Sequence, residues 1–142
     1  MRIKALSLTQ PWANWIAEGR KTIETRMWGT TYRGPLLICA TRQRVPDCDG
    51  PYGAAVCVAE LVDCRPMGPA DETPAMCEWE SGRRAWVLAN VRPIAPARIR
   101  GRQRLFDVIL PGDVYFDLLR ILGMPPVPPV PSVVDPEQGG GS

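Results

Sequence analysis

Residues 19–26 read Gly-Arg-Lys-Thr-Ile-Glu-Thr-Arg, and this stretch joins the end of an expected helix to the start of an expected strand. The charged side chains of Lys21, Glu24 and Arg26 are three and two positions apart. In an extended segment Glu24 and Arg26 share one face and Lys21 begins opposite, unless a turn at Gly19 brings it round. Two cations beside a carboxylate are suited to phosphate or a developing oxyanion. On spacing alone, a solvated strand with exposed ion pairs is the simpler interpretation.

Apolar segments on both sides of this stretch predict a sheet of five or six short strands. The expected strands cover residues 2–8, 22–26, 35–40, 54–64, 85–94 and 105–110. Turn-forming segments rich in Pro and Gly separate them, most clearly at 41–53. Short strands broken by turns, with few helices, indicate an α+β fold: a small mixed or antiparallel β-barrel flanked by short helices.

Two helices are expected, one before the charged stretch and one near the end of the chain. Thr9 or Gln10 suits the region of the N-cap and Pro11 the first helical position, and apolar residues follow at helical spacing. The same spacing predicts a helix over 112–123. A further helical turn is expected near residues 75–79.

Two charged features fall in the second half of the predicted sheet. Glu60 interrupts an apolar strand, so it needs either a polar face or a cationic partner such as Arg26. Several arginines gather over residues 92–104, and Pro93 and Pro96 favour a loop there. This loop is either a solvated surface or an edge that follows the phosphates of a nucleic acid.

Aromatic side chains flank the charged stretch. Trp12 and Trp15 lie three positions apart on the first expected helix. Core packing is the simpler interpretation for Trp15, whereas Trp12, in the first turn, could equally stack on a base. The loop after the charged stretch carries Trp28, Tyr32 and Arg33, which could cover a flat ligand or close over the core.

The bulk composition bounds the class of protein. The chain has 142 residues, 45% of them hydrophobic and 23% charged, which excludes global disorder. We expect one domain over residues 1–123, followed over 124–142 by a flexible Pro-rich tail that ends in a Gly-Gly-Gly-Ser linker remnant. Because the net charge is only +2, any nucleic-acid binding has to rest on local clusters of basic residues.

Histidine and cysteine usage limits the chemistry. The chain has no histidine, which excludes Ser-His-Asp and Cys-His mechanisms and removes the commonest metal ligand. Its five cysteines form no Cys-x-x-Cys pair, so neither a metal site nor a cofactor is predicted. An odd cysteine count without a signal peptide predicts a reducing cytoplasm. No apolar run approaches the roughly 20 residues of a membrane helix, so no membrane association is predicted.

Short sequence motifs are spread over most of the chain. The central one is Gly-x-Lys-x-x-Glu-x-Arg at 19–26. The others are Leu-Ser-Leu at 6–8, Gln-Pro-Trp-Ala at 10–13, Tyr-Arg-Gly-Pro-Leu at 32–36, Ala-Glu-Leu-Val-Asp-Cys at 59–64, Trp-x-Leu-x-Asn-Val-Arg-Pro at 86–93, Arg-Gly-Arg-Gln at 100–103 and Leu-Phe at 105–106. Together they resemble the activating signal cointegrator homology (ASCH) family over roughly residues 4 to 110, and the central motif in its strand context is fairly specific.

The resemblance implies a fold similar to the pseudouridine synthase and archaeosine transglycosylase (PUA) domain, a small barrel flanked by helices. It also implies that RNA, another nucleic acid or a nucleotide binds in a cleft lined by the central motif, although a fold does not determine a function. Carried over to this chain, Lys21, Glu24 and Arg26 would line the cleft. The remaining ligand-binding residues that we predict are Gln10, Trp12, Tyr32, Asn90 and Arg100.

Some relatives in the superfamily are amidohydrolases that remove the acetyl group of N4-acetylcytidine with a lysine, a threonine and a glutamate. Lys21 matches the lysine, but Glu24 stands in the place of the nucleophilic threonine. Strand alternation is expected to turn Thr22 and Thr25 in other directions. A ribonuclease activity is also described for bacterial members, and here it would need Lys21 or Glu24 as base and arginines that hold the phosphate.

Three functional hypotheses therefore stay open. The first is a nucleic-acid-binding module in which Lys21 and Arg26 engage phosphate, Glu24 orients Arg26 or binds an amino group, and Trp12 or Tyr32 stacks on a base. The second is a hydrolase of a modified nucleoside or of RNA, with Lys21 and Glu24 as catalytic residues, or with Glu60 in place of Glu24 as the acid/base partner. The third is an interaction domain whose Pro-rich tail recruits a protein partner.

Overall fold

The computed structural model describes residues 2–109, 120 and 123. Its elements, in chain order, are β1 (Arg2–Leu8), α1 (Trp12–Ala17), β2 (Ile23–Arg26), β3 (Gly34–Ala40), β4 (Ala54–Pro66), a 3-10 turn η1 (Pro69–Asp71), α2 (Glu72–Ala75), β5 (Arg84–Arg98) and β6 (Leu105–Ile109). All six expected strands are confirmed to within a few residues at each end. The helix expected over 112–123, apart from positions 120 and 123, and the tail over 124–142 lie outside the described residues.

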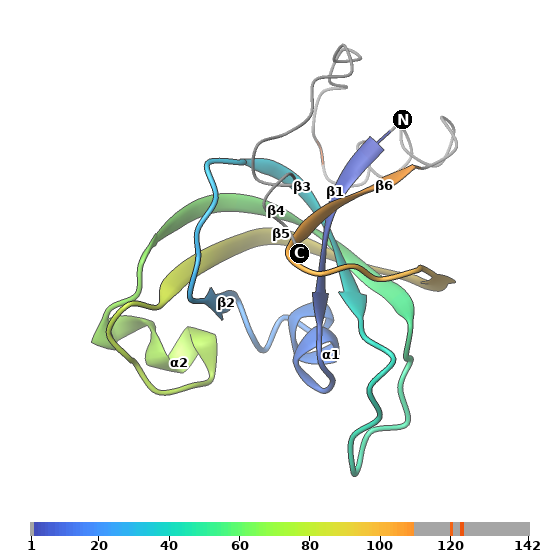
Figure 1. Ribbon diagram of the computed structural model, residues 1–142, viewed down its shortest axis with the longest axis horizontal. Helices are drawn as coiled ribbons and strands as arrows, with labels where there is room; N and C mark the ends of the chain where they lie inside the picture. The colour runs from blue at the N-terminus through green and yellow to red at the C-terminus, as the bar shows by residue number, and fades with distance from the viewer. Residues whose placement is uncertain (1, 110–119, 121–122, 124–142) are drawn as a thin grey trace.

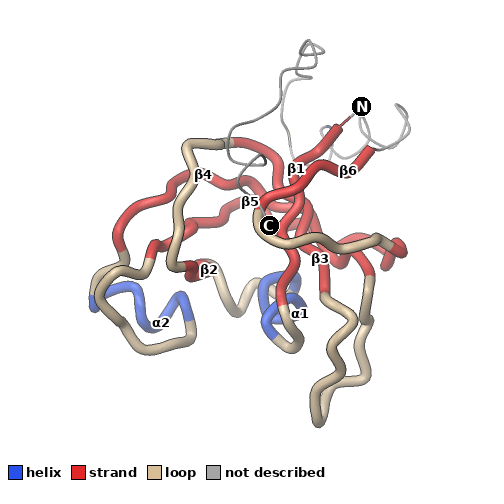
Figure 2. Tube along the Cα trace, viewed as in Figure 1, coloured by secondary structure: helices blue, strands red, loops and turns tan. Residues whose placement is uncertain are grey.

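The six strands form one mixed sheet in the order β2-β5-β4-β3-β1-β6. The pairing of β1 with β3 is parallel, and every other pairing is antiparallel. The sheet is strongly curved and arches over α1 and α2 (Figures 1 and 2). This arrangement confirms the expected α+β class. Within the described residues the two edge strands, β2 and β6, do not pair, so the barrel-like sheet stays open.

The core lies between the curved sheet and α1. The helix buries Ala13 and Ile16, and the sheet contributes Leu36 and Trp86, each with less than 2% of its surface exposed. A second, smaller cluster around Phe106 lies where β6 packs near β1 and β3. Burial of these side chains supplies the main driving force for the fold.

The start of α1 differs in detail from the expectation. Pro11 occupies the N-cap, one position before the first helical residue, and follows a cis peptide bond from Gln10. Gln10 still satisfies a free amide of the first turn, because its Oε1 accepts the N–H of Asn14 at 3.1 Å. Gln10 Nε2 also donates to Asn14 Oδ1 and to the carbonyl of Pro51, which ties α1 to the loop before β4.

The prediction that Pro93 and Pro96 form a loop is wrong, because β5 continues to Arg98. Its partner β2 pairs only with residues 84–87, so beyond that point β5 is an edge strand. An edge strand tolerates proline since one of its sides needs no ladder hydrogen bonds. The arginine-rich loop therefore begins after Arg98 and ends before Leu105.

Two further expectations are corrected. Glu60 does not pair with Arg26: its Oε2 accepts a hydrogen bond from Asn90 Nδ2 at 2.7 Å, next to an irregularity in the β4–β5 register where Asn90 has a positive φ of 51°. The expected helical turn ends at Ala75, because Met76 adopts a left-handed conformation that terminates α2. Among the described residues, no helix has the length and apolarity needed to cross a membrane.

Candidate functional site

A turn at Gly19 decides how the charged stretch is arranged. Gly19 has φ +80°, which favours glycine, and the N–H groups of Arg20 and Lys21 both donate to the carbonyl of Trp15, at 2.9 and 3.0 Å. Lys21 therefore precedes the regular strand instead of following its alternation. Its Nζ lies 3.6 Å from Glu24 Oε1. The turn thus places the Lys21 ammonium group beside the carboxylate of Glu24 on β2.

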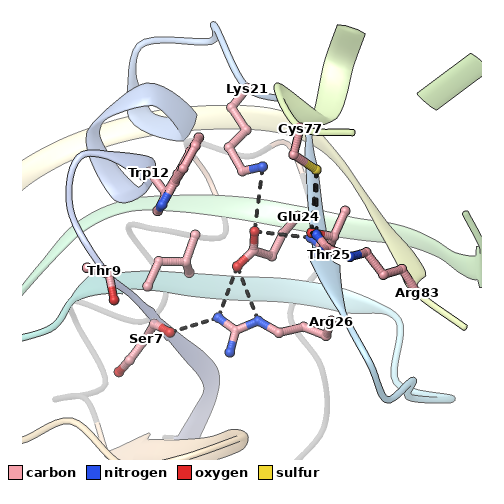
Figure 3. A pocket seen from close by; sticks show the side chains of 10 residues that line it. Ser7, Thr9, Trp12, Lys21, Glu24, Thr25, Arg26, Cys77 and Arg83 are labelled. Atoms are coloured by element: carbon pink, nitrogen blue, oxygen red, sulfur yellow. Dashed lines mark hydrogen bonds and ion pairs between the residues drawn. The ribbon is translucent and has the colours of Figure 1, made fainter. Parts of the chain in front are cut away.

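The Glu24 carboxylate forms the centre of the site, with both of its oxygens engaged (Figure 3). Oε2 lies 3.0 Å from Arg26 Nη2 and accepts from Arg26 Nε at 3.2 Å. Oε1 accepts from the backbone N–H of Thr25 at 3.1 Å and faces Lys21. Only 11% of the Glu24 side chain is exposed. Glu24 is thus placed to orient two cations, which is the pre-organisation that anion binding requires.

Arg26 also holds two strands together. Its Nη2 donates to the carbonyl of Ser7 on β1 at 2.8 Å. Arg26 itself lies on the edge strand β2, which β5, β4 and β3 separate from β1 in the sheet. The guanidinium therefore spans the opening of the curved sheet. A quarter of the Arg26 side chain remains exposed, 24%, so it still faces solvent at this opening.

Lys21 is a buried cation with three neighbours. Only 3% of its side chain is exposed, and its Nζ donates to the carbonyl of Ala75 at the end of α2. Nζ also lies 5.2 Å from the centre of the Trp12 ring. Burial lowers the pKa of Lys21 below its usual value of 10.5, although the nearby Glu24 carboxylate opposes the shift. Burial therefore has a larger effect on the pKa of Lys21 than the ion pair with Glu24.

The α2 segment that holds Lys21 is anchored by an ion pair. Arg65 of β4 donates to both oxygens of Asp71, at 2.7 and 2.8 Å, and Asp71 also accepts the N–H of Gly68 at 2.9 Å. The guanidinium and this amide lower the pKa of Asp71 from 3.8 to about 2. The ion pair thus fixes the short helix whose last carbonyl receives Lys21 Nζ.

A cleft of about 360 Å³ opens over these residues. Its lining brings together side chains from β1, α1, the charged stretch and the segment before β5, as Figure 3 shows. The lining residues are Ser7, Leu8, Thr9, Trp12, Lys21, Glu24, Thr25, Arg26, Cys77 and Arg83. A volume of this size lies at the lower end of the range for small-molecule sites, about 300–1,000 Å³.

Thr25 lines the same cleft as Glu24, although strand alternation turns the two side chains to opposite faces of β2. Its Oγ1 accepts from Arg83 Nη1 at 3.4 Å and lies 3.8 Å from Cys77 Sγ. The cleft wraps around the edge strand β2, so both faces of this strand contribute to it. Arg83 in turn pairs with Glu80, at 3.1 Å.

Cys77 and Arg83 are lining residues that the sequence analysis did not single out. Both lie in the irregular segment before β5. The antiparallel pairing of β2 with the start of β5 places Arg26 opposite Arg84 and so brings residue 83 beside the charged stretch. That pairing cannot be read from the periodicity of either strand alone.

Four of the predicted ligand-binding residues do not line the cleft. Gln10 is buried and holds α1 to the loop at Pro51. The Tyr32 hydroxyl donates to the carbonyl of Pro35, and Asn90 binds Glu60. Arg100 is exposed in the loop between β5 and β6. The structure brings together the other four, which are Trp12, Lys21, Glu24 and Arg26.

The donor set does not suggest a metal centre. Over residues 2–109, 120 and 123, no three or more Cys, Asp or Glu side chains are grouped so that they could hold a metal ion. The cleft therefore presents aromatic, cationic and hydroxyl groups, a combination suited to a planar or anionic organic ligand.

The comparisons with known proteins agree on one family. The sequence model of the ASCH domain matches residues 6–98 of this chain. No curated protein matches the chain. Among solved structures, the ASCH protein of Zymomonas mobilis is similar at 18% identity, with a TM-score of 0.60, and the match covers 82% of this chain and 93% of that one.

Two variants of the Zymomonas mobilis protein give the same result. A Tyr-to-Phe variant matches at 19% identity and TM-score 0.60, over 82% of this chain and 96% of its own. A Ser-to-Ala variant matches at 16% identity and TM-score 0.56, over 83% and 94%. At these identities the structural likeness establishes a shared fold and nothing finer.

Proposed function

The chain belongs to the ASCH domain family, and from this premise we propose that it binds nucleic acid, RNA or a modified nucleotide, with one nucleotide seated in the cleft. The observation that carries the proposal is the placement of Trp12 in the wall of a cleft that also contains the Lys21–Glu24–Arg26 group. An aromatic face beside cations is the combination with which proteins bind single bases and their phosphates.

The proposed roles differ among the three charged residues. Arg26 is the cation that contacts the ligand, because it is the more exposed of the two cations beside Glu24. Lys21 is almost fully buried, so it contributes positive charge next to the Glu24 carboxylate without contacting the ligand. Glu24 holds both cations in place, so it acts mainly as an orienting group. Trp12 provides the surface on which a base stacks.

An equilibrium titration with two variants tests this assignment. We expect Arg26→Gln to weaken binding of a ten-nucleotide single-stranded RNA by about tenfold or more, since a lost charge-assisted contact costs about 1.5–3 kcal/mol. The matched control is Arg20→Gln, which removes the same charge from an exposed arginine that pairs with Glu18 outside the cleft. Thermal unfolding checks that both variants are folded. Equal affinity of wild type and Arg26→Gln would reject the site.

A second candidate function is hydrolysis of a modified nucleoside such as N4-acetylcytidine, or of RNA. The observation that favours it is that a lysine with a lowered pKa and the hydroxyl of Thr25 meet in one cleft. The engagement of both Glu24 oxygens argues against Glu24 as a free general base. Incubation with N4-acetylcytidine and with structured RNA decides between the functions. Turnover that is lost in Lys21→Ala would support hydrolysis, and absence of turnover would reject it.

A further inference from the structure

The loop that joins β5 to β6, residues 99–104, carries unpaired positive charge. Arg100 and Arg102 are exposed, and so is Arg98 at the end of β5. Within the part of the chain that the structure describes, none of these three lies within 4 Å of a carboxylate, unlike Arg33, which pairs with an acidic side chain. A run of unneutralised arginines on one loop produces a local positive field despite the small net charge of the protein.

Close packing places this loop beside the cleft. A Cβ built on Gly101 would come within 3.1 Å of Ser7 Oγ, so the loop backbone lies directly against Ser7. Ser7 lines the cleft, and its carbonyl receives the Arg26 guanidinium. Figure 1 shows the loop crossing β1 between β5 and β6. The backbone of Arg100 and Arg102, the two neighbours of Gly101, therefore lies at the rim of the cleft.

A second contact fixes the other half of the loop. The guanidinium of Arg104 lies 4.4 Å from the centre of the Trp28 ring, and Trp28 packs edge-on against the buried Trp86 at 4.9 Å. The loop is thus held at Ser7 and at Trp28, which limits where its exposed arginines can point. Positions held in this way lose less conformational freedom when a ligand binds.

We propose that residues 98–104 form a phosphate-binding rim, and that the ligand is a single-stranded polynucleotide whose backbone follows this rim while one base enters the cleft. The inference rests on the proposed function of the cleft and adds the class of ligand to it. A cleft of about 360 Å³ accommodates one base, and that base is accessible only when it is unpaired. Guanidinium groups bind phosphate oxygens through paired N–H donors, independently of sequence.

The test compares two probes over a range of potassium chloride concentrations: a ten-nucleotide single-stranded RNA and cytidine 5′-monophosphate. In the double variant Arg100→Gln/Arg102→Gln we expect weaker binding of the RNA. Its plot of log affinity against log salt should become shallower by about 1.4, which corresponds to two phosphate contacts on a single strand. Affinity for cytidine monophosphate should stay unchanged. The charge-matched control, Arg2→Gln/Arg20→Gln, removes two exposed arginines that each lie within 4 Å of a carboxylate.

The outcomes separate this inference from the function of the cleft. If Arg26→Gln loses both probes while the rim variant keeps the wild-type salt dependence for RNA, the rim is rejected and the cleft assignment stands. If the wild-type protein binds neither probe, both are rejected. A poly-glutamate peptide tests for an acidic protein partner. If this peptide competes with RNA, and if its affinity falls in the rim variant by the same factor as the affinity for RNA, the loop binds an acidic protein. That result would overturn the proposed ligand class.

Discussion

Arg26 on β2 and Ser7 on β1 are joined by a 2.8 Å hydrogen bond from the guanidinium to the main-chain carbonyl, although their strands are not neighbours in the sheet. The charged group thus lies at the opening of the curved sheet, where β2 and β6 do not pair. Because Glu24 holds the same guanidinium from the other side, the arginine is fixed in space before any ligand arrives. A ligand that binds at this opening, as we propose, therefore requires little reordering of the guanidinium.

The aromatic wall can be tested with Trp12→Leu. Loss of a stacked ring should weaken binding of the single-stranded RNA by about 1–3 kcal/mol, which is roughly five- to 150-fold. Trp79→Leu is the control, since Trp79 is 43% exposed and does not line the cleft. Fluorescence anisotropy of labelled RNA measures both affinities. If the two variants bind equally well, Trp12 does not stack on the ligand.

The Asp71–Arg65 pair predicts an acid-sensitive component of stability. The folded state lowers the pKa of Asp71 from 3.8 to about 2, so its stabilising effect is complete above the unfolded value and is lost as pH falls from about 3.8 towards 2. Asp71→Asn should reduce the free energy of unfolding near neutral pH by about 1–2 kcal/mol, because water screens the half-exposed Arg65. Urea unfolding measures the difference, which should shrink across this acid range. A difference that is independent of pH would contradict the assignment.

Lys21 predicts a second pH-dependent component of stability, with a slope of the same sign, at alkaline pH. Burial lowers its pKa, so between the folded value and 10.5 the unfolded chain holds a proton that the folded chain has released. Under these conditions the free energy of unfolding rises with pH. Lys21→Met should remove this contribution, and the stability of wild type relative to the variant should therefore increase towards pH 10.5. Urea unfolding of both proteins at several alkaline pH values measures it. A relative stability that falls over this range would refute the lowered pKa.

The fold class could be predicted from the sequence because its signals are local. The continuous apolar run at 35–40 and the Val-rich segment at 54–64 are strands in any arrangement that buries them. The order of the strands could not be predicted in this way. The parallel pairing of β1 with β3 and the opening between β2 and β6 depend on contacts between distant segments. The extension of β5 through two prolines followed from its position at an edge, which periodicity does not reveal.

Trp12 and three of the four charged lining residues could be predicted from the sequence, whereas Arg83 and Cys77 could not. The family resemblance and the neighbouring aromatic residues pointed to Lys21, Glu24 and Arg26, whereas spacing alone favoured a solvated strand. That Glu24 engages both cations is a property of the turn at Gly19. Cys77 is brought to the cleft by the segment before β5, which has no regular pattern in the sequence.

Cys77 gives the most direct test of the cleft because it reports binding without any substitution. Cys39 and Cys57 are buried, and burial raises the pKa of each thiol to about 12, so both react slowly with N-ethylmaleimide. Cys48 and Cys77 are only partly buried. Cys77 lines the cleft, and Cys48, which does not, is an internal control in the same molecule.

The measurement is the alkylation rate of Cys77 and of Cys48, followed by peptide mass spectrometry, with and without saturating ten-nucleotide single-stranded RNA. If a nucleotide occupies the cleft, alkylation of Cys77 slows several-fold while the rate at Cys48 is unchanged. Unchanged rates at both cysteines, with RNA bound to the protein, would place the nucleic acid elsewhere and contradict the cleft as its binding site.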